Sequence, residues 1–285
     1  MPAESMSRSM TENYKNYSDP SLIVSVDEAN DLSDRNDVVF VDTRNYWKYV
    51  KGHIPGAFNL ELYGFHWIDT SREGVEIFAR QMAMLIGSLG IDRRKQVIFY
   101  QNNSGYDAAR GVWLLHLLGH EKARLLDGGL NLWKRKKLVL STVDPVAPKF
   151  GRFDPKLDLS AIASLDSVSK GLEGHHPTQF IDCRNAGEYT GRFKRAMKFG
   201  HIPSSLNIEW KSALRKDGTL KNSRQLQKLY RDVNKDGETI TYCQSGYRAA
   251  HSWLVLRLLG FQNVKNYLGS WYEWGNTNGT KVVRS

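Results

Sequence analysis

An internal duplication constrains the fold of this chain more than any other feature. The segment Val38–Arg44, followed by Gly52-His-Ile-Pro55, returns as Thr178–Arg184, followed by Gly200-His-Ile-Pro203. Both copies therefore read as an apolar run that ends in Asp-x-Arg, then a Gly-His-Ile-Pro segment. Two related segments of this kind indicate that one structural unit is present twice.

A second pair of segments extends the duplication. Ser104–Gly119 and Ser245–Gly260 lie 141 residues apart and agree at nine of sixteen positions. In the earlier pair the offset grows from 140 to 148, because the second copy carries an insertion near Gly191–Phe199. We expect this insertion to form a loop.

The length of the chain fits two domains. At about 150 residues per domain, 285 residues make two units of moderate size. A hydrophobic content of 41% with eight tryptophans provides core enough without disulfides or metals. We expect a flexible N-terminal tail over residues 1–20, a first domain over 21–140, a proline-containing linker over 141–150 and a second domain over 151–285.

Alternating strands and helices in both copies predict an α/β fold. The runs Val38–Val41 and Val97–Tyr100 are short, apolar and rich in β-branched or aromatic residues, as buried parallel strands are. Equivalent runs occupy 179–181 and 239–242 in the second copy. Amphipathic helices are expected over 108–118 and 249–259, and a further strand over 125–127 and 265–268. Each domain should hold a central parallel sheet flanked by helices.

Composition excludes several classes of function. No apolar run approaches the 18 or more residues of a membrane span, and the polar N-terminus lacks a signal-peptide core, so we expect a cytoplasmic protein. Cys183 and Cys243 are the two cysteines, and their spacing matches neither a disulfide framework nor a metal site. Cys183 is interpreted as a core residue, with a resolving thiol as the alternative.

The net charge of +10 is distributed unevenly. Residues 1–140 carry 18 basic and 17 acidic side chains, whereas residues 141–285 carry 22 and 13. The basic runs 134–137 and 192–195 lack the stacking aromatics or motifs of a nucleic-acid site and are interpreted as solvated faces. The excess of positive charge in the second half would also attract an anionic substrate to that half.

The loop after Tyr242 carries the clearest chemical signal. A cysteine between a strand and a helix N-terminus lies among free backbone N–H groups, which favour the nucleophilic thiolate. Cys243 has this position, Gly246 lets the loop turn inward, and Arg248 adds a cation. The alternative is that Cys243 is a small buried apolar residue. In the first copy Asn102 replaces the cysteine and Asp107 replaces the arginine, so only the second copy is expected to be catalytic.

These features together resemble the tandem-domain rhodaneses, sulfurtransferases of the thiosulfate or 3-mercaptopyruvate kind. The resemblance covers residues 22–280 and rests on both Asp-x-Arg strand ends, both Gly-His-Ile-Pro segments and the single cysteine loop. It implies that Cys243 takes a sulfane sulfur from a small anionic donor, becomes a persulfide and passes the sulfur to cyanide or a thiol acceptor, including a protein thiol. It also implies that no cofactor is needed and that the first domain is non-catalytic.

The resemblance and the local sequence define a set of candidate site residues. Cys243 is the expected nucleophile. The active-site and substrate-binding loop comprises Gln244, Ser245, Gly246, Tyr247 and Arg248. Ser245 and Arg248 are expected to bind the donor's oxyanion, with a helix cap and a solvent-facing side chain as the alternatives. Asp182, Arg184 and Trp210 are candidates for support, with a buried ion pair and core packing as their alternatives.

The choice of donor remains open between two types. Ser245 and Gly246 match the mercaptopyruvate-type loop, but Gln244, Tyr247 and Arg248 do not, and Glu188 stands where tandem enzymes often carry a substrate-binding arginine. We therefore expect thiosulfate rather than 3-mercaptopyruvate. A cysteine phosphatase is a second class, although it needs Cys-x5-Arg and this loop is Cys-x4-Arg. A sulfur-carrier or regulatory binding module is a third.

Overall fold

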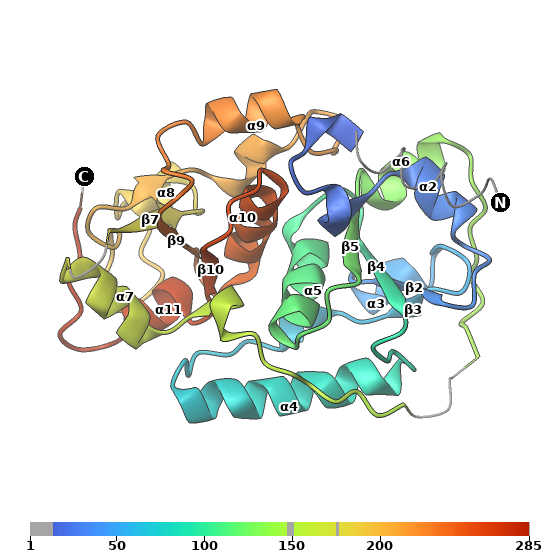
Figure 1. Cartoon of the computed structure of the whole chain (residues 1–285), viewed down its shortest axis with the longest axis horizontal. Helices are drawn as coiled ribbons and strands as arrows, with labels where there is room; N and C mark the ends of the chain where they lie inside the picture. Colours follow the sequence, from blue (N-terminus) through green and yellow to red (C-terminus); the bar gives the residue numbers. More distant parts are fainter. Residues whose placement is uncertain (1–13, 147–150, 175–176, 285) are drawn as a thin grey trace.

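The computed structural model describes residues 14–146, 151–174 and 177–284. In these residues each half of the chain forms one five-stranded, wholly parallel sheet (Figure 1). The first sheet has the order β1-β5-β4-β2-β3, with β1 (Ile23–Val24), β2 (Val38–Asp42), β3 (Phe58–Asn59), β4 (Gln96–Tyr100) and β5 (Ala123–Leu126). The second has the order β6-β10-β9-β7-β8, with β6 (Ile162–Ala163), β7 (Thr178–Asp182), β8 (Leu206–Asn207), β9 (Glu238–Tyr242) and β10 (Val264–Tyr267).

Helices flank both sheets. The first half contains α2 (Val26–Asp31), α3 (Tyr46–Tyr49), α4 (Arg72–Ser88), α5 (Tyr106–Leu117) and α6 (Gly129–Arg135), and the second contains α7 (Leu165–Leu172), α8 (Ala186–Tyr189), α9 (Ser223–Leu229), α10 (Tyr247–Leu258) and α11 (Ser270–Trp274). Short 3-10 helices are η1 (Tyr14–Asn16), η2 (Pro20–Leu22), η3 (Leu62–Gly64), η4 (Leu159–Ala161) and η5 (Trp210–Ala213). The predicted fold class, two tandem α/β units with a central parallel sheet each, is confirmed.

The predicted strands and helices of the two repeats are present, and their ends lie within a few residues of the expected ones. The insertion at 191–199 contains no helix or strand, as expected of a loop. No helix within the described ranges is long and apolar enough to cross a membrane.

The two halves share one hydrophobic core. A single cluster of buried residues contains Phe99 and Trp113 from the first half and Ile181, Cys243 and Leu254 from the second. Two smaller clusters cover the outer faces of the two sheets. The domains are therefore joined by continuous apolar packing, which contributes roughly 25 cal/mol for each Å² of apolar surface removed from water.

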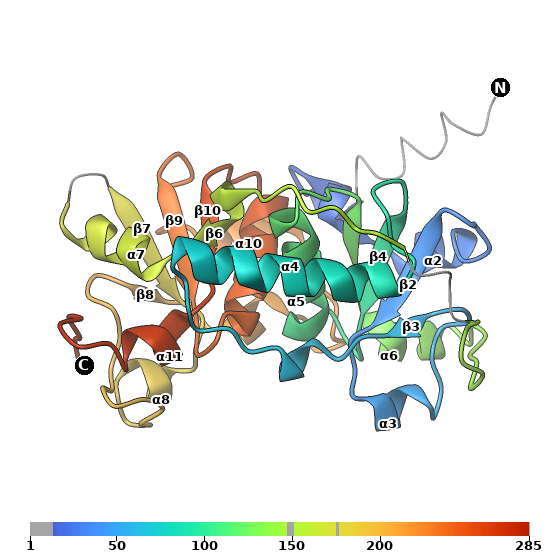
Figure 2. The ribbon, with the colours of Figure 1, turned by 90° about the horizontal axis from the view of Figure 1, so that it is seen from below.

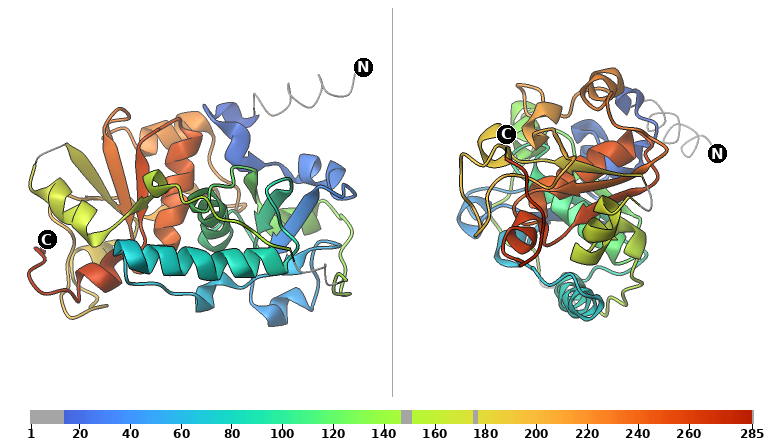
Figure 3. Two further views of the ribbon diagram at one scale, coloured as in Figure 1. Left: turned by 60° about the horizontal axis from the view of Figure 1, so that its bottom comes forward. Right: turned by 90° about the vertical axis from the view of Figure 1, so that its left-hand side faces the viewer.

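Three helices hold the junction between the domains. α5 and α10 lie side by side at its centre, and no other pair of helices in the described residues makes a more extensive contact (Figures 1 and 3). α4 runs along one side of the molecule and crosses the junction (Figure 2). Because α5 and α10 each follow the loop at the end of a central strand, both loops come close to the junction.

The N-terminal segment differs from the tail expected over residues 1–20. From Tyr14 onward it is packed, with the Tyr17 ring only 4% exposed and its hydroxyl donating to the Lys221 carbonyl oxygen at 2.5 Å. Asp19 N–H donates to the Leu258 carbonyl oxygen at 3.1 Å. The segment therefore bridges to the second half of the chain. Residues 1–13, and residues 147–150 of the expected linker, lie outside the described residues, and the domain boundaries stay predictions.

Candidate active site

The Ser270 hydroxyl binds two backbone N–H groups of the Cys243 loop. The N–H groups of Cys243 and Gly246 both donate to the Ser270 hydroxyl oxygen, at 3.1 and 3.0 Å, and that hydroxyl donates to the Tyr267 carbonyl oxygen at 2.7 Å. Gly246 has a φ of 77°, and a Cβ at this position would lie 2.7 Å from the Leu268 carbonyl oxygen. Only glycine fits there without moving the loop.

The first turn of α11 completes this support. Trp271 N–H donates to the Cys243 carbonyl oxygen at 3.0 Å, and Tyr272 N–H donates to the Gln244 carbonyl oxygen at 2.9 Å. The Cys243 and Gln244 carbonyl groups are thus bound by α11, whereas several N–H groups of the loop have no hydrogen-bond partner in the described part of the chain. These are the N–H groups of Gln244, Ser245, Tyr247 and Arg248. Such a group of amides at the N-terminus of a twelve-residue helix can bind an anion.

A pocket of about 380 Å³ opens above the loop at the domain junction. Its lining consists of Tyr63, Tyr106, Asn185, Glu188, Arg195, Glu209, Trp210, Lys211, Cys243, Gln244, Ser245, Tyr247 and Arg248. Cys243 is only 1% exposed, so its thiol meets the outside through this pocket. Tyr63 and Tyr106 belong to the first half of the chain, which therefore contributes a wall of the pocket.

Aromatic side chains shape that wall. The rings of Tyr106 and Trp210 meet edge to face at 4.9 Å, and the Tyr247 hydroxyl donates to the Leu62 carbonyl oxygen at 2.6 Å. The candidate Trp210 thus lies at the pocket. Trp271 and Trp274 do not line the pocket and are buried in the core.

Arg248 is bound by a carboxylate within the site. Its guanidinium donates to both oxygens of Glu188, at 2.7 and 3.0 Å, and Glu188 is 2% exposed. Burial opposes the charge on this carboxylate, but the hydrogen bonds from Arg248 outweigh it and lower the pKa of Glu188. The positive charge of Arg248 is therefore largely compensated by Glu188.

Two further cations line the pocket that the sequence did not single out. Arg195 and Lys211 are exposed and form no ion pair among the described residues. Arg195 belongs to the basic run interpreted as a solvated face, and its carbonyl oxygen accepts a hydrogen bond from Gln244 Nε2 at 3.1 Å. The insertion in the second copy thus contacts the cysteine loop. Because the first copy lacks both this insertion and the cysteine, the difference between the copies could have pointed to Arg195 as a residue of the site.

Asp182 and Arg184 lie outside the pocket lining. They form a buried ion pair, with Arg184 Nη2 2.5 Å from the Asp182 carboxylate and 2.7 Å from the Gly200 carbonyl oxygen. Asp42 and Arg44 repeat the arrangement in the first half. The pair fixes the Gly-His-Ile-Pro segment to the strand end, which favours the structural alternative.

Cys183 is the neighbour of Cys243 at the ends of adjacent strands. Asp182 of β7 is in register with Tyr242 of β9, and Cys183 N–H donates to the Tyr242 carbonyl oxygen at 2.8 Å. Cys183 is fully buried, and burial raises the pKa of its thiol well above the ordinary value. This environment fits the interpretation of Cys183 as a core residue.

The equivalent loop of the first half is filled by other parts of the chain. Ser104 N–H donates to the Gly218 carbonyl oxygen at 2.9 Å, and Asp127 accepts from the Ser104 hydroxyl at 2.6 Å. Lys15 forms an ion pair with the same Asp127 carboxylate. At the position of Arg248 the partly buried Asp107 has a pKa raised by desolvation to about 7. This loop therefore has neither a nucleophile nor an open anion site.

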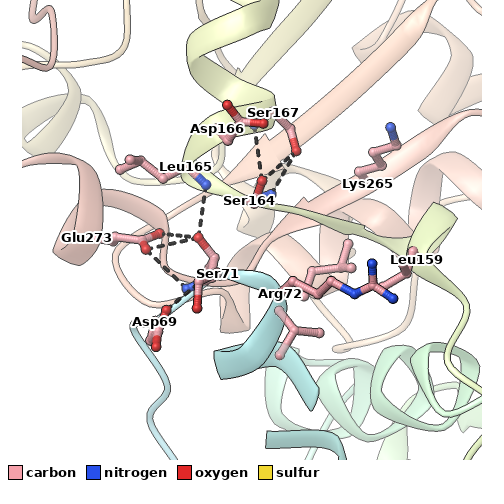
Figure 4. Close-up of a pocket in the computed structure, with 13 residues that line it drawn as sticks. Asp69, Ser71, Arg72, Leu159, Ser164, Leu165, Asp166, Ser167, Lys265 and Glu273 are labelled. Atoms are coloured by element: carbon pink, nitrogen blue, oxygen red, sulfur yellow. Dashed lines mark hydrogen bonds between the residues drawn. The ribbon is translucent and has the colours of Figure 1, made fainter. Parts of the chain in front are cut away.

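A larger pocket, of about 660 Å³, lies elsewhere along the junction (Figure 4). Several of its polar groups are bound to one another. The Thr70 hydroxyl donates to Glu273 at 2.8 Å and accepts from Leu165 N–H at 2.9 Å, and Ser164 and Ser167 cap α7 reciprocally. Burial raises the pKa of Glu273. These contacts tie Thr70, in the segment just before α4, to α7 and α11. The pocket with the greater volume therefore marks a contact between the domains.

Comparison with known protein families agrees with the geometry. The family model described as "Rhodanese-like domain" matches residues 25–136 and again residues 164–277. The chain belongs to the rhodanese family. Each matched segment contains four of the five strands of one sheet, all but β1 in the first half and all but β6 in the second. The resemblance inferred from the sequence is therefore confirmed for both halves of this rhodanese.

Individual relatives match 80–94% of this rhodanese chain. The thiosulfate sulfurtransferase of Corynebacterium glutamicum is 34% identical over 238 residues, 80% of this chain and 78% of the relative. The sulfur carrier protein TtuD of Thermus thermophilus is 33% identical over 285 residues, 94% and 98% of the two chains. The crystal structure of SseA from Escherichia coli, described as a 3-mercaptopyruvate sulfotransferase, superimposes with a TM-score of 0.75 at 28% identity, covering 88% of this chain and 99% of SseA.

Ser270 supplies a test of the loop's geometry in this rhodanese. Ser270→Ala should lower kcat/KM about 10- to 100-fold, because two buried N–H groups lose their acceptor and the cysteine loop can relax. The measurement is steady-state kinetics with thiosulfate and cyanide. Ser252→Ala is the matched control, since Ser252 is also a fully buried serine but binds neither the Cys243 nor the Gly246 N–H group. Equal losses in the two variants would contradict a specific role for Ser270.

Proposed function

We propose that this rhodanese is a sulfurtransferase that moves a sulfane sulfur from thiosulfate to cyanide or a thiol acceptor through a persulfide on Cys243. One observation carries the proposal. The Cys243 thiol meets the pocket among loop N–H groups that have no other partner in the described residues. The naming of the Corynebacterium glutamicum relative as a thiosulfate sulfurtransferase supports the choice of donor.

The first half-reaction is a nucleophilic attack on sulfur. The Cys243 thiolate attacks the outer sulfur of thiosulfate, the sulfur–sulfur bond of the donor breaks, and sulfite leaves with the electron pair. The negative charge stays on the new terminal sulfur of the persulfide. The unpartnered loop amides are suited to hold that charge, because they are already oriented before the reaction begins.

The second half-reaction restores the enzyme. Cyanide attacks the terminal sulfur of the persulfide, and the bond between Cys243 Sγ and that sulfur breaks. Thiocyanate leaves, and Cys243 returns to the thiolate. A thiol acceptor would attack the same sulfur and carry it away as its own persulfide. Both steps balance without an external oxidant or cofactor. The reducing cytoplasm, where we place the protein, would keep Cys243 available as a thiol.

Charges around the pocket favour a compact dianionic donor. Arg195 and Lys211 line the pocket without ion pairs in the described structure and can attract the sulfonate end of thiosulfate. Ser245 lines the pocket, and its hydroxyl can donate to the same group. Glu188 compensates Arg248, which leaves that cation less suited to bind the carboxylate of 3-mercaptopyruvate.

Donor preference is tested by steady-state kinetics with both compounds. Thiosulfate should give a kcat/KM at least about tenfold higher than 3-mercaptopyruvate, measured as thiocyanate and as pyruvate release respectively. A higher kcat/KM for 3-mercaptopyruvate would overturn the choice of donor but leave the Cys243 persulfide intact. Hydrolysis of p-nitrophenyl phosphate at a comparable rate would favour the phosphatase alternative instead.

The ion pair between Arg248 and Glu188 gives a second prediction. Arg248→Ala should raise the KM for thiosulfate about tenfold, because it leaves the buried Glu188 carboxylate uncompensated beside an anionic donor. The double variant Arg248→Ala/Glu188→Gln removes both charges and should return the KM to within about threefold of the wild type. A double variant as impaired as the single one would show that compensation of Glu188 is not what Arg248 contributes.

A protein-to-protein sulfur carrier is the second candidate function. The naming of the Thermus thermophilus relative as a sulfur carrier protein favours it, and the persulfide chemistry would be the same. The carrier would hand its sulfur to a protein thiol in preference to cyanide. Comparable discharge of the loaded protein by cyanide and by any small thiol, with no protein acceptor in pull-downs, would count against it.

A further inference from the structure

Arg110 is a buried cation without a buried anion beside it. It lies on α5 in the first domain, is 2% exposed, and forms no ion pair among the described residues. Its side chain donates one hydrogen bond within the described residues, across the domain junction from Nη1 to the Gly246 carbonyl oxygen at 3.3 Å. The rest of its guanidinium packs against aromatic rings, 4.4 Å from the Trp113 centroid and 4.9 Å from that of Tyr247.

Burying an unpaired guanidinium costs folding free energy unless the charge interacts with an anion in the working protein. An unpaired guanidinium loses its hydration on burial, and aromatic faces return only part of that free energy. Burial lowers the pKa of Arg110 to about 10, so the side chain is still charged at neutral pH. A carboxylate would be the ordinary compensation, as at Asp182 and Arg184.

Among the titratable groups around Arg110, Cys243 is the one that can carry a negative charge near neutral pH. Tyr247 and Cys243 are the groups that favour the charged guanidinium, and His66 also faces it. Burial raises the pKa of Tyr247 to about 12, so this phenol is neutral at neutral pH. His66 carries no negative charge in either form. The remaining partner is the Cys243 thiolate, or the persulfide formed on it.

The pseudo-symmetry of the two domains gives independent support. His251 occupies the position of Arg110 in the second copy, and its Nε2 lies 3.0 Å from the Ser104 carbonyl oxygen, one residue before Gly105, the counterpart of Gly246. Each central helix therefore contacts the opposite domain's loop from the same position. Burial lowers the pKa of His251 to about 4, so this side chain is neutral. The permanent cation faces the loop with the cysteine, and the neutral imidazole faces the loop without one.

We propose that Arg110 is a positioning residue by which the non-catalytic domain stabilises negative charge on Cys243 from across the domain junction. The persulfide part of this role rests on the proposed function, whereas stabilisation of the thiolate does not. Other titratable groups that act on Cys243 are Tyr106 of α5, Cys183 after β7, and Tyr247 and Arg248 of α10. Of the two cations, Arg248 is already paired with Glu188, and Arg110 is not.

The test is the pH dependence of Cys243 alkylation by iodoacetamide, an uncharged reagent, followed by mass spectrometry of the peptide that contains Cys243. Arg110→Gln keeps a donor for the Gly246 carbonyl but removes the charge, and Arg110→Met removes both. Each should slow alkylation at pH 7 about tenfold, with the difference from the wild type disappearing at high pH. Arg110→Lys keeps the charge and should stay within about threefold of the wild type.

His251→Gln is the matched control on the other side of the pseudo-symmetry axis and should leave the profile unchanged. A wild-type profile for a folded Arg110→Gln would overturn the proposal, and so would an equal shift in His251→Gln. Arg110→Met should fold as well as the wild type, since apolar replacement of an uncompensated buried charge is not costly. Its failure to fold would show that Arg110 is structural. Alkylation needs no sulfur donor, so a failure of the sulfurtransferase function would leave these outcomes readable.

Discussion

Cys243→Ser should reduce sulfur transfer from thiosulfate to cyanide by at least about a thousandfold. A serine hydroxyl is not ionised at neutral pH and forms no stable sulfur adduct, so both half-reactions lose their nucleophile. The fold should survive, because the loop is held by backbone N–H and carbonyl groups rather than by the thiol. Thiocyanate production and the thermal unfolding midpoint are the two measurements.

Cys183→Ala is the matched control for this prediction. Cys183 is the second thiol of the chain, lies at the end of the neighbouring strand and does not line the Cys243 pocket. The variant should keep transfer within about threefold of the wild type, with a small loss of stability from the missing sulfur. Transfer retained in Cys243→Ser and lost in Cys183→Ala would exchange the roles of the two cysteines.

Asp182→Asn should lower the free energy of unfolding by about 3–5 kcal/mol. The Asp182 carboxylate accepts three kinds of hydrogen bond from Arg184, from its backbone N–H, Nε and Nη2, and both side chains are at most 1% exposed. An amide in its place leaves the Arg184 charge buried and uncompensated. Urea unfolding followed by circular dichroism measures the loss.

The exposed ion pair of Arg35 with Asp37 is the control for that measurement. Its side chains are 57% and 55% exposed, so Asp37→Asn should change the free energy of unfolding by less than about 1 kcal/mol. The contrast between the two substitutions separates a buried pair from a solvated one. A loss of similar size in both would contradict the structural role assigned to Asp182 and Arg184.

The central strands and helices could be predicted because their sequences are decisive locally. β4 and β9 are continuous runs with four buried residues each, and α5 and α10 are the helices that follow them. The edge strands β1, β3, β6 and β8 could not be predicted, since each has two residues and exists through pairing with a longer neighbour. Their position is set by tertiary contacts rather than by local pattern.

The residues of the site also fall into those that the local sequence predicts and those that it does not. Cys243 and Gly246 follow a strand directly, so their roles were visible in one short segment. Ser270, Arg195 and Arg110 reach the same loop from three other elements, and no local pattern marks them. Comparison of the two copies held part of this information, because Ser270 stands where the first copy has Gly129 and Arg110 where the second has His251.

The pairing of Arg248 with Glu188 was also beyond the sequence. Sequence reasoning treated Arg248 as a free cation for the donor and Glu188 as a missing arginine. In the structure the two side chains form an ion pair. The presence of glutamate rather than arginine at position 188 therefore changes the function assigned to Arg248, because Glu188 compensates its charge. The first copy carries the reversed charges, Lys48 and Asp107, at the equivalent positions. That reversal was visible in the repeat, but its meaning required the distance between the two residues.

Intact mass spectrometry after incubation with thiosulfate tests the central claim most directly. The wild type should gain about 32 Da, Cys243→Ser should gain nothing, and cyanide should remove the increment with release of an equivalent amount of thiocyanate. A wild-type protein that gains no mass from thiosulfate, or whose increment persists in Cys243→Ser, would contradict a persulfide on Cys243.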